Sequence, residues 1–167
     1  MRPTRKNKAR RGVVAVEAAV ILPVLIILMF GIWEVGRVVQ VNQIVINAAR
    51  EGARLAAGGY VNSVPVTSTM VTTAVQDYML SAGLPATAVN NSTVTLNCQA
   101  SPSWSDPSAA NPLDAFQVTV TIPSGAAFNS LKWNLLAPIT NMNQMSATVA
   151  WRSLNNTEIV VDTALPY

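Results

Sequence analysis

The chain has 167 residues, of which 50% are hydrophobic and only 11% are charged, against about 25% charged residues in an average soluble domain. It contains no histidine and one cysteine, Cys98. This composition excludes histidine-based acid–base catalysis, Cys/His metal sites and an intramolecular disulfide. Cys98 is expected to be a small residue buried in a strand, and pairing between chains is the alternative.

The charges are segregated along the chain. The basic residues of the head are Arg2, Arg5, Lys6, Lys8, Arg10 and Arg11. No acidic residue lies among them, so the head before Gly12 carries +6 and the remainder carries −3. A basic head by itself would suit nucleic-acid binding. The apolar run that follows it indicates a membrane instead, and no nucleic-acid partner is expected.

Residues 13–33 form an apolar run of 21 residues that contains one charge, Glu17, and one proline, Pro23. As a helix it would be about 31 Å long, close to the roughly 30 Å hydrocarbon core of a bilayer. The basic head predicts that the N-terminus stays in the cytoplasm. The run is not followed by the small-x-small site of a secretory signal peptide, so standard signal cleavage is not expected.

Glu17 is a carboxylate within this predicted membrane helix. Such groups are unfavourable in lipid and usually have a partner. The alternative is a side chain that reaches back to the cytoplasmic interface and has no further role.

The string RRG/VVAVE resembles the processing site of type IV prepilins, with the cut between Gly12 and Val13 and the glutamate at Glu17. The resemblance implies that a membrane prepilin peptidase removes the leader. A new ammonium at Val13 then meets a glutamate of a neighbouring subunit during assembly. In a low-dielectric setting these opposite charges would attract strongly. Ala18 stands where the tight-adherence branch of this family often has an aromatic residue.

The helical pattern continues beyond Trp33, and a single helix is expected over residues 13–57, about 68 Å long. Gly58 and Gly59 are the predicted stop. The polar stripe of this extension consists of Arg37, Gln40, Gln43, Asn47, Arg50 and Arg54. The apolar stripe consists of Val38, Val41, Val45, Ala48 or Ala49, and Ala56.

The segments FGIWEVGR (residues 30–37) and NAAREGARLAA (residues 47–57) resemble the N-terminal signature of TadE-like proteins, which belong to tight-adherence (Flp) pilus systems. The resemblance covers about residues 10–59. The residues at recurrent polar positions of that family are Glu34, Arg37, Arg50, Glu51 and Arg54. Two interpretations of them stay open: a solvated helix face with Glu34–Arg37 and Glu51–Arg54 pairs, or a docking surface for a partner subunit.

After Gly59 the composition shifts to Thr, Ser, Asn and Ala. A second helix is expected over residues 66–82, with Thr67 or Ser68 as N-cap and a face formed by Met70, Ala74 or Val75, and Tyr78. Alternation predicts strands, and these are 93–98, 115–122 and 145–152. Three further segments are expected: a proline-rich loop over 99–112, a helical turn near 128–136 carrying Trp133, and a fourth strand or a tail over 157–162.

The fold class predicted is therefore α+β, a long N-terminal transmembrane helix continuing into a small helix-plus-antiparallel-sheet domain. The parts are a basic cytoplasmic leader (1–12), the transmembrane helix (13–33), an amphipathic extension (34–59) and an extracytoplasmic domain (60–167). Asp106 and Asp114 flank the loop without the dense spacing of a calcium site. Trp104 and Trp133 are expected to anchor core or loop rather than to bind a partner.

Together these features predict a TadE-like pseudopilin or minor pilin of the bacterial inner membrane, single-pass, with no enzymatic activity, cofactor or metal. Its expected partners are the prepilin peptidase, other pilin or pseudopilin subunits and the pilus assembly machinery. The alternative is an uncleaved, membrane-anchored envelope protein that acts as a scaffold in a secretion complex.

Overall fold

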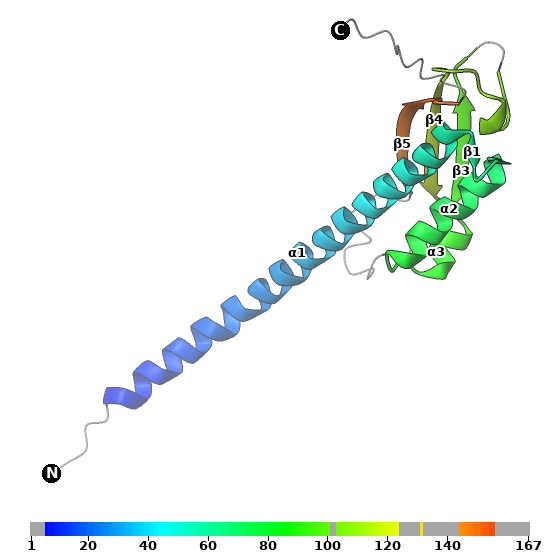
Figure 1. The fold of residues 1–167 in the computed structure, drawn as a ribbon. Helices are drawn as coiled ribbons and strands as arrows, with labels where there is room; N and C mark the ends of the chain where they lie inside the picture. Colours follow the sequence, from blue (N-terminus) through cyan, green and yellow to red (C-terminus); the bar gives the residue numbers. More distant parts are fainter. Residues whose placement is uncertain (1–5, 101–102, 124–130, 132–143, 156–167) are drawn as a thin grey trace, which may run out of the picture.

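The computed structural model describes residues 6–100, 103–123, 131 and 144–155, with side chains from residue 12 onward. Its dominant feature is one helix, α1 (Lys6–Gly58), which projects far beyond the small domain packed on its C-terminal end (Figure 1). The helix begins seven residues before the predicted Val13. Lysine, arginine and alanine are strong helix formers, so the basic head extends the helix instead of ending it.

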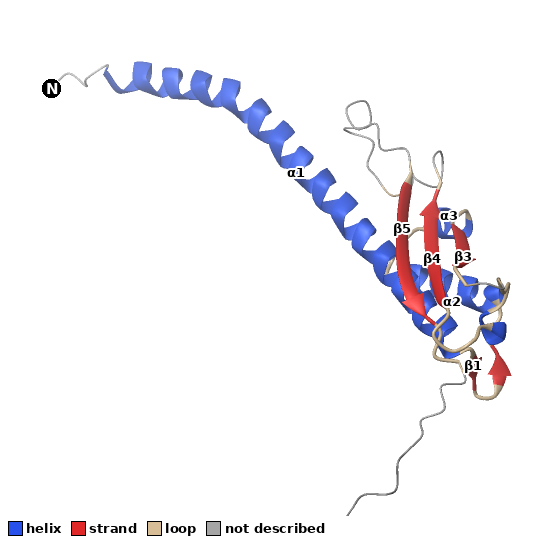
Figure 2. Ribbon diagram, turned by 90° about the horizontal axis from the view of Figure 1, so that it is seen from above, coloured by secondary structure: helices blue, strands red, loops and turns tan. Residues whose placement is uncertain are grey.

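Pro23 lies inside α1 and the helix continues through it. Figure 2 shows α1 as one gently curved rod. At the other end Gly59 ends the helix, with φ at +66°, and its N–H donates to the carbonyl of Ala56 at 3.2 Å. A left-handed residue just beyond the last turn is the usual role of glycine there, and the predicted stop at Gly58 and Gly59 is confirmed.

The domain contains a three-stranded antiparallel sheet in the order β3 (Thr93–Cys98), β4 (Ala115–Ile122) and β5 (Met145–Arg152). All three strands have the bounds predicted from alternation. In the central strand the burial alternates strictly, with Phe116, Val118, Val120 and Ile122 buried. The register pairs Val118 with Leu96 on one side and with Val149 on the other.

The second predicted helix is α2 (Ser68–Ser81), and Thr67 is its N-cap, accepting a hydrogen bond from the N–H of Met70 at 3.3 Å. The predicted face is correct at Val75, one of the two alternatives given there, and wrong by one residue at Met70 and Tyr78. The buried positions are Val71, Val75 and Met79, whereas Met70, Ala74 and Tyr78 are only half-buried. The helix is apolar on several sides, so its sequence periodicity does not identify one face.

Four short elements were not predicted. They are a hairpin of β1 (Tyr60–Val61) and β2 (Val64–Pro65), helix α3 (Ala86–Asn90) and a 3₁₀ turn, η1 (Pro107–Ala109). The turn η1 lies in the predicted proline-rich loop. The predictions made for 128–136, including Trp133, and for 157–162 fall outside the described residues, apart from Leu131, which is buried.

The C-terminal part of α1 and helix α2 lie together against one face of the sheet, and Figure 2 shows the strands in front of α1 with the other face open. The core lies between these two layers. It combines Val41, Val45, Ala48, Ala49, Ala53 and Ala56 of α1, Val71, Val75 and Met79 of α2, and the inward residues of β4 and β5. The fold is therefore the predicted α+β arrangement of a long apolar helix with a small antiparallel domain.

The segment after β5 fastens the end of α1 to the domain. The N–H of Leu154 donates to the carbonyl of Ala57 at 2.8 Å. The buried Asn155 side chain donates to the carbonyls of Ser108 and Ala110 at 3.0 and 3.1 Å. Three segments far apart in sequence thus meet where the helix ends.

Candidate functional site

The N-terminal half of α1 is the part of the described chain that fits a membrane by length and composition. Its large apolar side chains, from Val13 to Trp33, are almost all exposed. So many exposed apolar groups are not found on a soluble surface and indicate lipid or protein around the helix. One helix of this kind agrees with a single membrane anchor.

Gly12, Val13 and Glu17 lie on this N-terminal half of α1, which is not covered by the described domain. No described atom lies within 4 Å of the position that a Cβ at Gly12 would occupy. Val13 is exposed, and Glu17 is exposed one turn further along the helix. Among the residues whose side chains the structure describes, no residue of the domain lies around Glu17.

The polar stripe predicted on the extension faces away from the domain. Arg50 and Arg54 are exposed, and Arg37 is half-buried. Arg37 donates a hydrogen bond to Gln40 at 3.2 Å, and Arg50 donates one to Asn47 at 3.3 Å. These i, i+3 contacts keep the cationic groups on the helix surface without covering them.

The predicted Glu51–Arg54 pair is confirmed. The Arg54 guanidinium donates two hydrogen bonds to the Glu51 carboxylate, at 2.9 and 2.6 Å. This bidentate contact lowers the pKa of the Glu51 carboxyl and raises the pKa of Arg54. Because Arg54 is exposed to water, the pair adds little to stability and mainly holds the two side chains in place.

Glu34 differs from the other candidate docking residues because it is buried, with 8% of its surface exposed. It lies at the end of the apolar run, where α1 passes into the domain. The structure therefore separates the five residues into one buried acid and an outward face on which Arg50 and Arg54 are exposed and Arg37 and Glu51 are half-buried.

On the opposite side of the same helix, small residues let the domain approach closely. A Cβ built on Gly52 would lie 2.5 Å from Cγ2 of Val75 and 3.3 Å from Cγ1 of Val71. Ala48, Ala49 and Ala53 beside it are fully buried. The segment NAAREGARLAA thus has two faces, with alanine and glycine buried against the domain and the charged residues turned outward.

The two loop carboxylates considered for calcium serve the backbone instead. Asp106 Oδ1 accepts a hydrogen bond from the N–H of Ser68 at 2.8 Å, at the start of α2. Asp114 Oδ2 accepts one from the N–H of Asn111 at 2.8 Å. Across the residues that the structure describes, no three Asp, Glu or Cys side chains gather in a way that would hold a metal.

Replacing Asp106 with alanine is expected to lower the free energy of unfolding by about 1 kcal/mol, because the first turn of α2 would lose a capping acceptor. Urea denaturation of the full chain in detergent micelles, followed by tryptophan fluorescence, measures this. The matched control is Asp77→Ala, an exposed aspartate on the same helix, with an expected change within about 0.5 kcal/mol. Equal losses in the two variants would contradict the capping role of Asp106.

Trp104 and Cys98 contact other residues of the domain. The Trp104 ring packs edge-on against Phe116, with centroids 5.6 Å apart and planes at 66°. The expected anchoring of the loop on the core is confirmed for this tryptophan. Cys98 lies in β3, as predicted, but it is half-buried rather than buried, with its sulfur beside the backbone N–H of Ala100.

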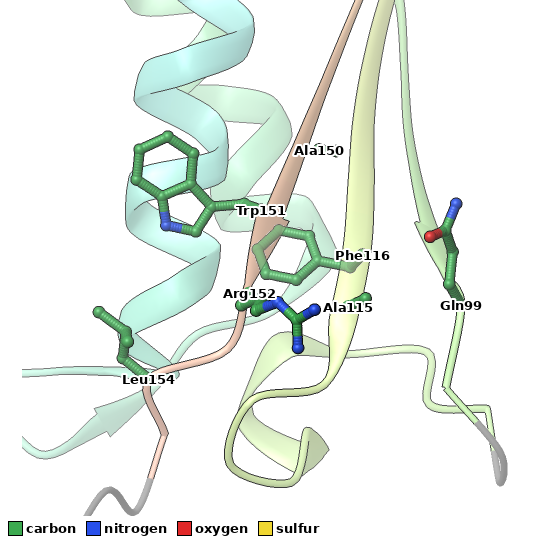
Figure 3. A pocket seen from close by; sticks show the side chains of 7 residues that line it. All are labelled: Gln99, Ala115, Phe116, Ala150, Trp151, Arg152 and Leu154. Atoms are coloured by element: carbon green, nitrogen blue, oxygen red, sulfur yellow. The ribbon is translucent and has the colours of Figure 1, made fainter.

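A hollow at one end of the sheet was not predicted. It measures about 400 Å³ and is lined by Gln99, Ala115, Phe116, Ala150, Trp151, Arg152 and Leu154. Figure 3 shows the Arg152 guanidinium beside Ala115, with Gln99 across from it and Trp151 on the other side of β5. The sequence places these residues in separate segments, so the register of the strands was needed to find the hollow.

Comparison with known proteins gives one finding. The sequence model of the TadE family, described as TadE-like protein, matches residues 12–54. No curated protein and no solved structure matches the chain. The matched segment contains the apolar half of α1 together with Ala48, Ala49, Gly52 and Ala53 of the small-residue face and all four residues of the charged face.

Proposed function

We propose that this chain, whose residues 12–54 match the TadE-like family, is a pseudopilin or minor pilin that acts in assembly of a tight-adherence pilus. The observation that carries the proposal is the match itself. It begins at Gly12, the residue after which the leader would be cut, and runs into the segment on which the domain folds. Participation in pilus assembly is what the family implies, and the finer roles below are part of the proposal.

In this proposal α1 has two successive roles. It first anchors the protein in the inner membrane, with the basic head in the cytoplasm and the domain outside. After the cut between Gly12 and Val13, its exposed apolar half packs against other subunits in the filament base. Glu17 then faces the new ammonium of a neighbour, which satisfies a carboxylate that has no domain residue beside it.

The outward face of α1 is the proposed docking surface for a partner subunit or for the assembly machinery. Arg37, Arg50 and Arg54 give this face cationic groups, and Glu51 holds one of them in a fixed orientation. Arginine side chains fixed in this way are well suited to recognise carboxylates of a partner. Glu34 would act at the membrane boundary, since its burial keeps it off this face.

The second candidate is an uncleaved scaffold of a secretion complex, anchored by the same helix. In the structure α1 begins at Lys6 and runs without interruption through Gly12. Because residues 6–12 of the leader belong to the same helix as the anchor, the leader is not a separate segment, and this favours the uncleaved scaffold. The state of the N-terminus in cells distinguishes the two.

The mature protein is expected to begin at Val13 in cells with an active prepilin peptidase. N-terminal sequencing or intact mass of the membrane-extracted protein measures this. The uncut form should accumulate in a strain that lacks the peptidase. A chain that retains its first twelve residues in the presence of active peptidase would refute processing and leave the scaffold as the better description.

A further inference from the structure

Two helices of the domain each leave one side uncovered. The C-terminal part of α1 and helix α2 lie side by side against one face of the sheet (Figure 1), and each turns its other side outward. Besides its charged residues, the outward face of α1 carries Gln43 and Asn47, which are exposed. The outward face of α2 consists of the exposed residues Thr73, Asp77 and Leu80. Residues spaced by three or four positions share one side of a helix, so each face is a continuous stripe.

The two faces carry opposite charges that are not paired within the described chain. Arg50 makes one hydrogen bond there, to Asn47 of its own helix at 3.3 Å. Asp77 has no hydrogen bond or ion pair among the described residues, whereas Asp106 and Asp114 each accept from a backbone N–H. A guanidinium has five N–H donors and a carboxylate can accept two of them at once. Arg50 and Asp77 are therefore complementary groups, and both are accessible to a partner.

The two faces also match in their apolar parts. The outward face of α1 has a hollow of about 350 Å³, lined by Gln43, Ile46, Asn47 and Arg50. Ile46, one turn from Arg50, is the apolar residue in this lining and is half-buried. On α2, Leu80 lies one turn from Asp77 and is 42% exposed. One face thus has a hollow with an apolar residue beside a cation, and the other has an exposed leucine beside an anion.

Arg50 and Asp77 lie at nearly the same height along α1. Helix α2 starts beside the end of α1 and runs back along it (Figure 1). Gly52 and Val75 are level, because a Cβ built on Gly52 would lie 2.5 Å from Cγ2 of Val75. Arg50 is two residues before Gly52 and Asp77 is two residues after Val75, so each is displaced by about 3 Å in the same direction. Copies held in one membrane by the same anchor share one height, which brings Arg50 of one copy level with Asp77 of the next.

We propose that the outward face of α1 in one copy binds the outward face of α2 in a second copy, with Arg50 paired to Asp77 and Leu80 placed in the hollow beside Ile46. This inference names the partner of the docking surface proposed above and rests on that role. The opposite charges set the register of the contact, and burial of the leucine adds a hydrophobic contribution. A second copy suits both faces, because each face carries the charge that the other one needs.

The test measures self-association of the full chain in detergent micelles by sedimentation equilibrium at about 0.15 M salt, where charges within about 8 Å still interact. The natural chain is expected to form dimers or larger assemblies. Arg50→Asp and Asp77→Arg each bring like charges together and are expected to weaken association at least about tenfold. An equal mixture of the two variants is expected to regain the natural affinity, because each variant supplies the charge that the other lacks.

Arg152→Asp is the matched control, because it makes the same change of charge on the open face of the sheet. It is expected to leave association unchanged. A chain that stays monomeric, equal weakening by Arg152→Asp and Arg50→Asp, or no recovery in the mixture would each overturn the proposal. These outcomes do not depend on cleavage after Gly12 or on piliation. A chain that associates in this way but is never cut and never found in pili would overturn the proposed function and leave the contact standing.

Discussion

Replacing Glu17 with alanine is expected to leave the protein in the membrane and to abolish piliation. Glu17 lies on an exposed turn of α1, one turn from Val13, and no described residue of the domain surrounds it. In an assembled filament its carboxylate would neutralise the ammonium that processing creates at Val13 of a neighbour. Removing one partner of a buried pair leaves the other charge unpaired and costs about 3–5 kcal/mol at each subunit contact. Such a loss, repeated along a filament, would prevent assembly.

Two measurements are needed for this variant. Immunoblots of the membrane fraction report insertion, and electron microscopy of cells reports surface pili. Insertion should be unchanged, because alanine is more favourable in lipid than a carboxylate. Glu17→Gln tests whether charge or shape matters, and it should fail as Glu17→Ala does. Val16→Ala, at the neighbouring apolar position, is the control and should form pili. Normal pili in the Glu17→Ala strain would mean that the carboxylate has no role in assembly.

The sheet could be predicted because its strands carry a local signal. In β4 the sequence AFQVTVTI is rich in β-branched residues and alternates apolar with polar ones. The structure buries every second residue of the strand. The end of α1 was equally clear, because Gly59 adopts a positive φ that favours glycine. In both places the signal is local, because the alternation in β4 and the glycine after α1 can each be recognised from a few neighbouring residues.

The missed elements are those whose signals are short or depend on distant residues. Each strand of the β1–β2 hairpin has two residues, and its turn places Asn62 and Ser63 at positive φ without a glycine. Helix α3 has five residues. The capping role of Asp106 depends on Ser68, 38 residues earlier in the chain. No sequence pattern connects such a pair before the fold is known.

The candidate site residues also differ in whether their signal is local in the sequence or depends on distant residues. Glu17 was named as the one charge in an apolar run and by the resemblance to a prepilin processing site. The arginines could be placed on one polar stripe from their spacing, because a helix fixes which residues share a face. The burial of Glu34 could not, since the spacing assigns it to the same polar set as Arg37. The hollow beside Arg152 required the register of three strands. Sequence reasoning can therefore group residues that share one helix face, whereas residues brought together by several strands are grouped only once the register is known.

The glycine at position 52 gives the second large effect. Gly52→Ala is expected to lower the free energy of unfolding by about 1–3 kcal/mol, the usual range for overpacking a core. The added methyl would lie 2.5 Å from Cγ2 of Val75. Val75 and Val71 are fully buried, and a valine in a helix has one strongly preferred rotamer. The side chains cannot turn away, so α2 has to move from α1. Urea denaturation in detergent micelles, followed by tryptophan fluorescence, measures the loss.

The same substitution elsewhere in α1 separates the contact from helix propensity. No described atom lies within 4 Å of a Cβ at Gly36, so Gly36→Ala is expected to stabilise the protein by about 0.5–1 kcal/mol. In a Val75→Ala background, adding Gly52→Ala should have much less effect than in the natural chain, because the clashing methyl is gone. Destabilisation of the same size in both backgrounds would show that the loss does not come from the α1–α2 contact. Since Gly52 lies in the matched TadE-like segment, a confirmed contact would tie that part of the segment to folding of the domain, and would leave Glu17 and the outward arginines as the positions at which to look for assembly.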